Sequence, residues 1–185
     1  MWRFTSVAAP AIEPVSLSDA RRQCNLLPDE TEFDGQLGAL ILVARNHIEV
    51  TSGLYFGSRA VTVSSGVFSD LARLPVAPVT AVTSLSYTDA GGVEQEIPSR
   101  DYVLANHDQH GIEQSITPPP GERWPAAPSG ARIILTVQAG FDPTPPDVQH
   151  AMLMWIDQAF RTREPTKVDG WTTLDSLLCN YRRGA

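Results

Sequence analysis

The sequence has few of the residues that a redox, metal-binding or nucleic-acid-binding role requires. It contains two cysteines, Cys24 and Cys179, which form neither a Cys-x-x-Cys pair nor a zinc-like spacing. We expect both to be free thiols on the apolar sides of helices, as in a reducing compartment. The net charge of −7 at pH 7 also argues against a protein that grips nucleic acid by neutralising its phosphates.

Long apolar runs and common catalytic motifs are missing as well. No uncharged stretch is both long enough and free of proline to span a bilayer, and the first residues lack the apolar core of a signal peptide. The chain has no Gly-x-Ser-x-Gly, Walker or dinucleotide-binding motif. We therefore expect a non-enzymatic protein with no membrane partner, which stays in the cytoplasm until it is assembled.

One loop carries residues that a metal-dependent enzyme would need. His107-Asp108-Gln109-His110, with Asp101 upstream, places two imidazoles and two carboxylates close in sequence. His-x-x-His in a turn lacks the helical i, i+4 spacing that aims both rings at one ion. We therefore expect a polar loop with no catalytic residue, no metal and no cofactor, and keep a small metal-dependent hydrolase as an alternative.

The segment 14–53 predicts two helices with marked starts. Ser16 with Asp19, and Thr31 with Asp34, have the three-residue spacing of a capping box. In the second helix, apolar residues recur at steps of three and four, which predicts one buried face. These residues are Phe33, Leu37, Leu40, Ile41, Ala44 and Ile48.

The end of the second helix is marked by Gly53, which favours a helix stop. Arg45 and Glu49 lie one helical turn apart, so we expect an exposed ion pair that contributes little to stability.

Acids dominate residues 13–34 and bases dominate residues 160–185, a pattern that suits head-to-tail packing in a ring and equally suits two ordinary solvated surfaces. The candidate subunit–subunit residues are Arg21, Arg22, Arg45 and Glu49.

The middle of the chain predicts strands. Alternating or β-branched runs occur at residues 60–63, 79–87 and 133–137, with shorter candidates at 94–97 and 102–105. Residues 89–92 predict a hairpin turn, because two glycines there can take a positive φ.

The C-terminal part predicts two more helices. From Thr144 to Phe160 an N-terminal cap and proline precede an apolar face that repeats over several turns. After a linker, Trp171, Leu174, Leu178 and Tyr181 share one face of a last, short helix. Because such short helices are marginal alone, we expect this segment to be held weakly by its own domain and to act as a docking arm.

These motifs and their order resemble the head-tail connector (adaptor) family of long-tailed phages and gene transfer agents. Pro14-Val15-Ser16-Leu17-Ser18-Asp19-Ala20 fits the family's Pro-Val-Ser/Thr-Leu-x-Glu/Asp-Ala helix start. Residues 44–53 fit its Ala-Arg-x-x-Ile-Glu-x-x-Thr-Gly helix end, with the small departure that Ser52 stands between Thr51 and Gly53. Residues 74–79 resemble its Leu-Pro-x-x-Pro-Val element, and residues 177–182 its Leu-Leu-x-x-Tyr-Arg ending.

The resemblance implies a structural protein at the head-tail interface of a virion or virion-like particle. It implies a dodecameric ring that binds the portal, extends the DNA channel and provides a platform for the next connector, the stopper or the tail. Double-stranded DNA would pass without specific binding, which an acidic wall favours because it repels phosphate. An alternative is another head-completion protein, a stopper or tail terminator. The candidate portal-docking residues are Trp171, Leu174, Leu177, Leu178, Tyr181, Arg182 and Arg183.

The sequence as a whole predicts an α+β fold. We expect a mainly helical bundle, made of an N-terminal helix pair plus C-terminal helices, with an inserted β-rich region. The expected parts are an N-terminal helical part (1–58), the inserted β-rich region (59–141), a helix completing the bundle (142–164), and a linker with the C-terminal docking arm (165–185).

Overall fold

The computed structural model describes residues 1–128, 131–162 and 172–183, and divides into two compact units. The sheet unit comprises Met1–Ala11 and Ser58–Gly140, and the helical unit comprises Ile12–Gly57 and Phe141–Ala185. Among the described residues, no helix is both long and apolar enough to cross a membrane.

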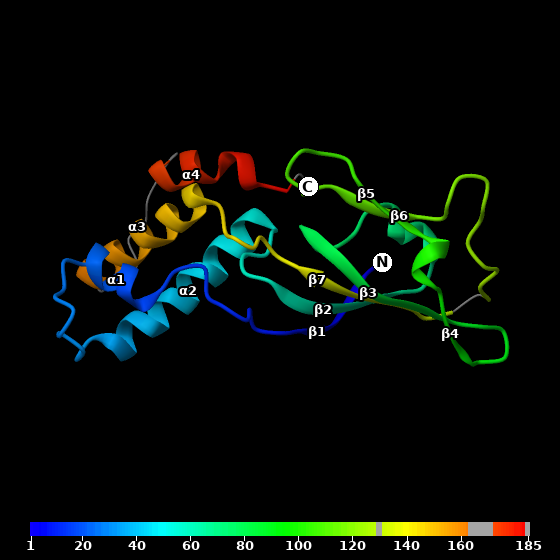
Figure 1. Cartoon of the computed structure of the whole chain (residues 1–185), viewed down its shortest axis with the longest axis horizontal. Helices are drawn as coiled ribbons and strands as arrows, with labels where there is room; N and C mark the ends of the chain where they lie inside the picture. The colour runs from blue at the N-terminus through cyan, green and yellow to red at the C-terminus, as the bar shows by residue number, and fades with distance from the viewer. Residues whose placement is uncertain (129–130, 163–171, 184–185) are drawn as a thin grey trace. The chain divides into compact units, whose positions relative to one another are not determined.

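The sheet unit is built on a five-stranded antiparallel sheet (Figure 1). Its described elements are β1 (Arg3–Val7), β2 (Arg59–Ser65), η1 (Phe68–Ala72), β3 (Val79–Thr88), β4 (Glu94–Glu96), η2 (Ser99–Asp101), β5 (Val103–Asn106), β6 (Gln114–Thr117) and β7 (Ile133–Ala139). The strand order of this sheet is β1-β2-β7-β3-β4, so β1 and β4 form its edges. β5 and β6 pair separately as a two-stranded antiparallel sheet.

Alternating side chains give the larger sheet one apolar face. Leu135 and Val137 of β7 are fully buried, and so are their partners on β2, Val63 and Val61. On its other side Leu135 pairs with Leu85 of β3, which is also fully buried. Side chains directly opposite one another share a face, so these residues form the centre of the core. The predicted strands at residues 60–63, 79–87 and 133–137 are confirmed.

β1 is an edge strand that the sequence analysis did not predict. Phe4 lies opposite Val63 and Val7 lies opposite Val61, with a register shift between the two pairs. Because the extra residue changes the alternation, Phe4 and Val7 both point to the apolar face of the sheet. Phe4 is 53% exposed and Val7 is 45% exposed, so this face continues to the open edge.

Gln114 joins the two-stranded sheet to the start of β3. Its side chain is buried; Oε1 accepts from the Val79 amide at 2.6 Å, and Nε2 donates to the Val79 carbonyl at 2.8 Å. Nε2 also donates to Asn106 Oδ1 at 2.7 Å. The amide side chain therefore pairs with both backbone groups of one residue, as a neighbouring strand would.

The helical unit contains helices that bury one face each against their neighbours. Its described elements are α1 (Leu17–Gln23), α2 (Asp34–Ser52), α3 (Pro146–Thr162), α4 (Thr173–Leu178) and η3 (Cys179–Tyr181). Two ring contacts join α2 and its start to α3: Phe33 lies edge-on to Phe160 at 5.5 Å, and His47 stacks on Trp155 at 5.9 Å. The buried residues of the two long helices are Leu37, Ile41, Ala44, Ile48, Val148, Ala151, Met152 and Ile156.

The predicted helix signals are confirmed in part. Ser16 is the N-cap of α1, where its hydroxyl accepts from the Asp19 amide at 3.1 Å. Gly53 ends α2 with a φ of 71°. The Thr31 cap is wrong: α2 begins after Phe33, which makes no side-chain capping bond. The Asp34 carboxylate, which would complete the capping box, instead accepts from Arg21 Nε at 2.7 Å.

The two cysteines differ in their surroundings. Both are free; Cys24 is buried, and burial raises the pKa of its thiol. Cys179 is exposed, because it follows α4 and lies at the start of η3 rather than on a buried helix face. The prediction of an apolar helix environment therefore holds for Cys24 and is wrong for Cys179.

The prediction of a mainly helical bundle is wrong. The structure is a mixed, sheet-rich fold in which the five-stranded antiparallel sheet accompanies four α-helices in the described residues. The sequence analysis gave too much weight to the helices, because the caps and apolar repeats that predict a helix lie within a few residues of one another. β1 and β6 were not predicted: the bulge in β1 interrupts its alternation, and the Gln-Ser-Ile-Thr sequence of β6 contains a single apolar residue.

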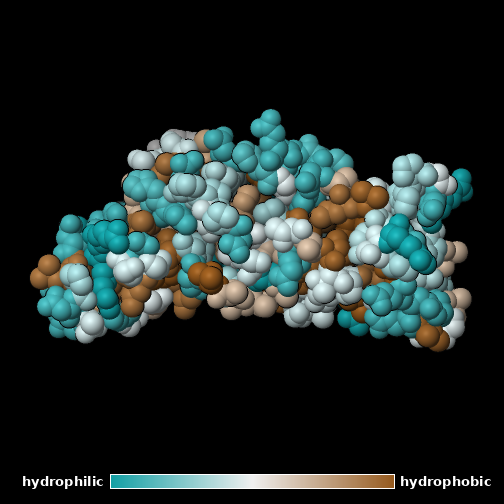
Figure 2. Space-filling model, viewed as in Figure 1, coloured by the Kyte–Doolittle hydropathy of each residue, from teal (hydrophilic) through white to brown (hydrophobic). Residues whose placement is uncertain are grey.

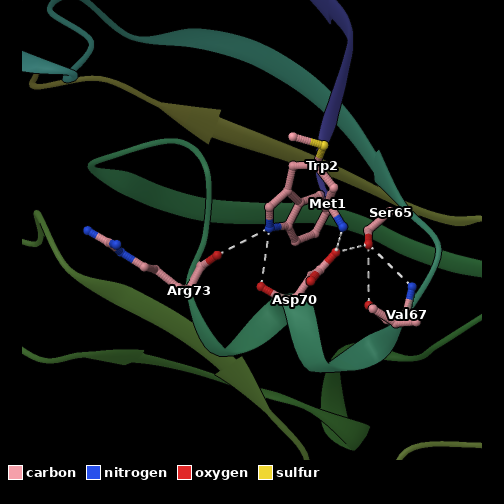
Figure 3. A network of polar contacts seen from close by, with 6 residues as sticks. All are labelled: Met1, Trp2, Ser65, Val67, Asp70 and Arg73. Carbon is pink, nitrogen blue, oxygen red and sulfur yellow. Dashed lines mark hydrogen bonds and ion pairs between the residues drawn. The ribbon is translucent and has the colours of Figure 1, made fainter. Parts of the chain in front are cut away.

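Asp70 of η1 anchors the chain that leads into β1 (Figure 3). The α-amino group of Met1 lies 2.5 Å from Asp70 Oδ2, and Ser65 Oγ donates to the same carboxylate oxygen. Trp2 Nε1 donates to the carbonyls of Asp70 and Arg73, each at 3.2 Å. These bonds hold the edge strand against the rest of the sheet unit.

We expect Asp70→Asn to lower the free energy of unfolding at neutral pH and to lose this effect in acid. The pKa of Asp70 is lowered, first by the hydrogen bond from the Met1 ammonium and then by the Ser65 hydroxyl. Such a carboxylate stabilises the fold above its unfolded pKa of about 3.9, and the contribution disappears as the pH falls through the folded pKa. Urea unfolding across this range measures the effect.

Asp29→Asn is the matched control, since Asp29 is an exposed acid in the connection between α1 and α2. A difference between wild type and Asp70→Asn that stays constant from neutral to acidic pH would contradict the assignment.

Candidate functional site

Arg45 and Glu49 form a nearly buried network at the end of α2. Their side chains are 13% and 8% exposed, so the expectation of an exposed pair is wrong. Arg45 donates from Nε to Glu13 Oε2 at 2.7 Å and from Nη1 to Glu49 Oε2 at 3.2 Å. Glu49 Oε1 accepts from the Phe56 amide at 3.0 Å. The network therefore joins α2 to the chain that precedes α1 and to the chain that follows the helix.

The Phe56 segment in turn positions the start of the chain that leads into α3. Phe56 stacks on Phe141 with ring centroids 5.6 Å apart, and the Gly57 amide donates to the Phe141 carbonyl at 3.0 Å. The Phe141 amide donates to the Tyr55 carbonyl at 3.1 Å. The last turn of α2, through Glu49 and Phe56, thus positions Phe141, at which the C-terminal half of the helical unit begins.

The remaining candidate subunit–subunit residues also have partners within the chain. Arg21 binds the Asp34 carboxylate through two nitrogens, and this pair ties α1 to the first turn of α2. Arg22 lies 3.5 Å from Asp19 on the same helix and is 79% exposed. Of Arg21, Arg22, Arg45 and Glu49, Arg22 is thus the most available to a second molecule. The role of all four in subunit contacts stays a prediction.

α4 begins at a complete capping box. Thr172 Oγ1 accepts from the Asp175 amide at 3.1 Å, and the Asp175 carboxylate accepts from the Thr172 amide at 3.0 Å. Asp175 also pairs with Arg182, which follows η3. The Thr172 hydroxyl, followed by the Thr172 amide and Arg182, lowers the pKa of Asp175. One carboxylate therefore holds both ends of this short segment.

The segment 172–183 packs within the helical unit. Leu178 is buried, and the Tyr181 ring stands edge-on to Phe141 at 6.0 Å. The backbone amide of Arg183 donates to the Ser52 carbonyl at 2.8 Å. The segment is thus packed on its own unit, because α4 contacts α3 and Tyr181 of η3 contacts Phe141.

The candidate portal-docking residues are only partly available to a partner. Leu174 and Leu177 are half-buried, and the Arg182 side chain is 36% exposed. Trp171 lies outside the described residues. The use of this surface for portal docking stays a prediction.

The loop between β5 and β6 is organised by its own hydrogen bonds. His107 Nε2 lies 2.7 Å from Ser115 Oγ. The Asp108 carboxylate accepts from the Ile112 amide at 2.8 Å, which shapes the turn. Within residues 1–128, 131–162 and 172–183, no group of three His, Cys, Asp or Glu side chains is arranged to hold a metal ion.

The sequence analysis followed one face of α2 and missed the other. The opposite side of this helix is also apolar and is exposed, with Leu42 at 49%, Val43 at 50% and Val50 at 76%. A usable signal was present, because no charged residue occurs between Asp34 and Arg45. A helix face that meets only water normally carries charged residues.

We expect Glu49→Ala to destabilise the protein by about 3 kcal/mol, because it leaves the Phe56 amide without its side-chain acceptor and weakens the pairing of a nearly buried guanidinium. Glu32→Ala, at an exposed acid in the connection before α2, is the matched control and should stay within about 0.5 kcal/mol of wild type. Urea denaturation measures both. Equal effects of the two substitutions would contradict the structural role of Glu49.

The chain matches no family model and no curated protein. Its fold is similar to chains in three solved structures of gene transfer agent (GTA) particles, each 21% identical in sequence. The neck of an empty GTA particle computed with C6 symmetry and the virion of a native GTA particle each give a TM-score of 0.79, covering 100% of this chain and 96% of the other. The neck of a native GTA particle computed with C12 symmetry gives 0.77, covering 99% and 96%. At this identity the likeness establishes a common fold.

Proposed function

We propose that this chain is a structural, non-enzymatic protein of the neck of a virion-like particle. The observation that carries the proposal is the likeness of fold over the whole chain, since 100% of it aligns with 96% of a chain in a GTA neck. A match of this extent includes both the sheet unit and the helical unit. It therefore supports a shared role better than a match confined to one common motif would.

The sequence motifs support the same assignment. In the helix-end motif of residues 44–53, Ile48 is buried in the core, and Arg45 and Glu49 form the network that positions Phe56. In the helix-start motif, Ser16 caps α1. The motif residues thus determine how the elements of the helical unit pack together. This packing explains why the motif residues occur at these spacings.

Within the neck, we assign the chain to the head-tail connector that forms a ring on the portal. The similar structures were computed with C6 and C12 symmetry, and a ring of twelve copies satisfies both. Such a ring extends the DNA channel and offers a platform to the stopper or tail. The net charge of −7 suits a wall past which DNA moves without binding, because like charges repel.

Portal docking is assigned to the C-terminal segment. Leu174 and Leu177 are half-buried on a short helix, and the Arg182 guanidinium, which pairs with Asp175, is 36% exposed beside them. An apolar patch with a basic rim fits an acidic groove on a partner. The capping box keeps this segment helical before any partner binds.

Imaging of particles from cells that produce the protein tests the assignment. We expect density for twelve copies directly beneath the portal, with the segment 172–183 facing it. Cells lacking the gene should make DNA-filled heads without attached tails. Twelve copies farther from the portal would indicate a stopper or tail terminator instead, and absence of the chain from purified particles would overturn the neck assignment.

We expect the free protein to be a monomer or a small oligomer. Among the described residues, no single helix or strand exposes more than three large apolar side chains, which is far less surface than the roughly 800 Å² per partner that stable interfaces bury. Ring formation should therefore require the portal as a template. Light scattering at micromolar concentration measures the mass, and a stable dodecamer in dilute buffer without portal would contradict this expectation.

A further inference from the structure

α2 has two apolar faces, and only one is buried in the helical unit. The exposed face follows the helix for about three turns and comprises Ala39, Leu42, Val43 and Val50, which we call the outer α2 stripe. At 100° per residue these positions lie opposite the buried residues Leu37, Ile41, Ala44 and Ile48. Figure 2 shows brown, apolar side chains in the region where Figure 1 draws α2.

We propose that the outer α2 stripe is the surface on which a second copy of this chain packs in the ring. The inference rests on the proposed neck function and names the partner of one surface within it. A helix that is apolar on opposite sides is expected to be covered on both. The helical unit covers one side of α2, so the assembly has to cover the other.

The chemistry of the stripe favours a protein surface over DNA. Leu42, Val43 and Val50 are aliphatic, and Asn46 between them is uncharged. A surface that held DNA would need arginine or lysine to neutralise phosphates. The occupant must therefore present a neutral, apolar face.

A ring of identical copies supplies such an occupant. Under cyclic symmetry above two-fold, each copy uses two different patches, one toward each neighbour. The chain carries a second uncharged apolar patch on β1, where Phe4 and Val7 are 53% and 45% exposed on one face of the sheet. Two distinct patches on one chain are what a head-to-tail ring requires.

The size of the stripe also fits a contact made within a ring. Three exposed aliphatic side chains and one alanine cover much less than the roughly 800 Å² per partner of a stable two-protein interface. The stripe alone therefore cannot hold two free chains together. When the portal holds neighbouring copies side by side, the effective concentration of one copy next to another is high. The weak contact through the stripe can then form, as it would within a single molecule.

Val43→Glu and Val50→Glu test this contact. Both positions are at least half exposed, so each variant should fold and melt close to wild type. We expect at least tenfold fewer copies per particle for each variant. Gln158→Glu places the same charge on an exposed position of α3 and should enter particles at the wild-type level. Normal incorporation of both folded variants would overturn the inference.

A photo-crosslinking residue at position 43 identifies the occupant directly. In assembled particles we expect crosslinked dimers and higher multiples of this chain, whereas the same residue at position 158 should give none. Crosslinks from position 43 to the portal or to another neck protein would overturn the inference and leave the neck function standing. Absence of the wild-type chain from particles would overturn both.

Discussion

The carboxylate of Glu49 is the contact on which the arrangement of the helical unit depends. One oxygen pairs with Arg45, which also binds Glu13, and the other accepts from the Phe56 amide. Phe56 stacks on Phe141, and Phe141 meets Tyr181. Contacts that run from Glu13, before α1, to Tyr181 of η3 thus pass through one nearly buried ion pair.

We infer that this pair contributes more to the specificity of the fold than to its net stability. Removing two charges from water is costly, and the attraction between them offsets this cost only when their remaining hydrogen bonds are also satisfied. In this protein Arg45 has two carboxylate partners and Glu49 has a backbone donor in addition. A segment displaced by a few ångströms would lose these bonds, so the network selects one position for the chain after α2.

In the proposed ring, α2 links this internal order to assembly. Its inner face is fully used within the helical unit, while its outer stripe exposes Leu42, Val43 and Val50 to solvent. The sheet unit shows a related pattern at β1, where a shift in register turns Phe4 and Val7 toward the apolar face at an open edge. Each exposed apolar surface is small, so it costs the free chain little free energy. Both surfaces become favourable contacts when copies are held next to one another.

The sequence by itself determined the features that depend on neighbouring residues. The Ser16 cap, the Gly53 stop, the buried face of α2 and the alternation of β7 follow from spacing within a few residues. Only the tertiary structure decided where the charges lie and how the strands pair. Arg45 and Glu49 have the spacing of an ordinary surface pair, and Glu13 and Phe56 become their partners through folding. β1 pairs with a strand more than fifty residues away, and such long-range hydrogen bonds leave no periodic mark in a five-residue segment.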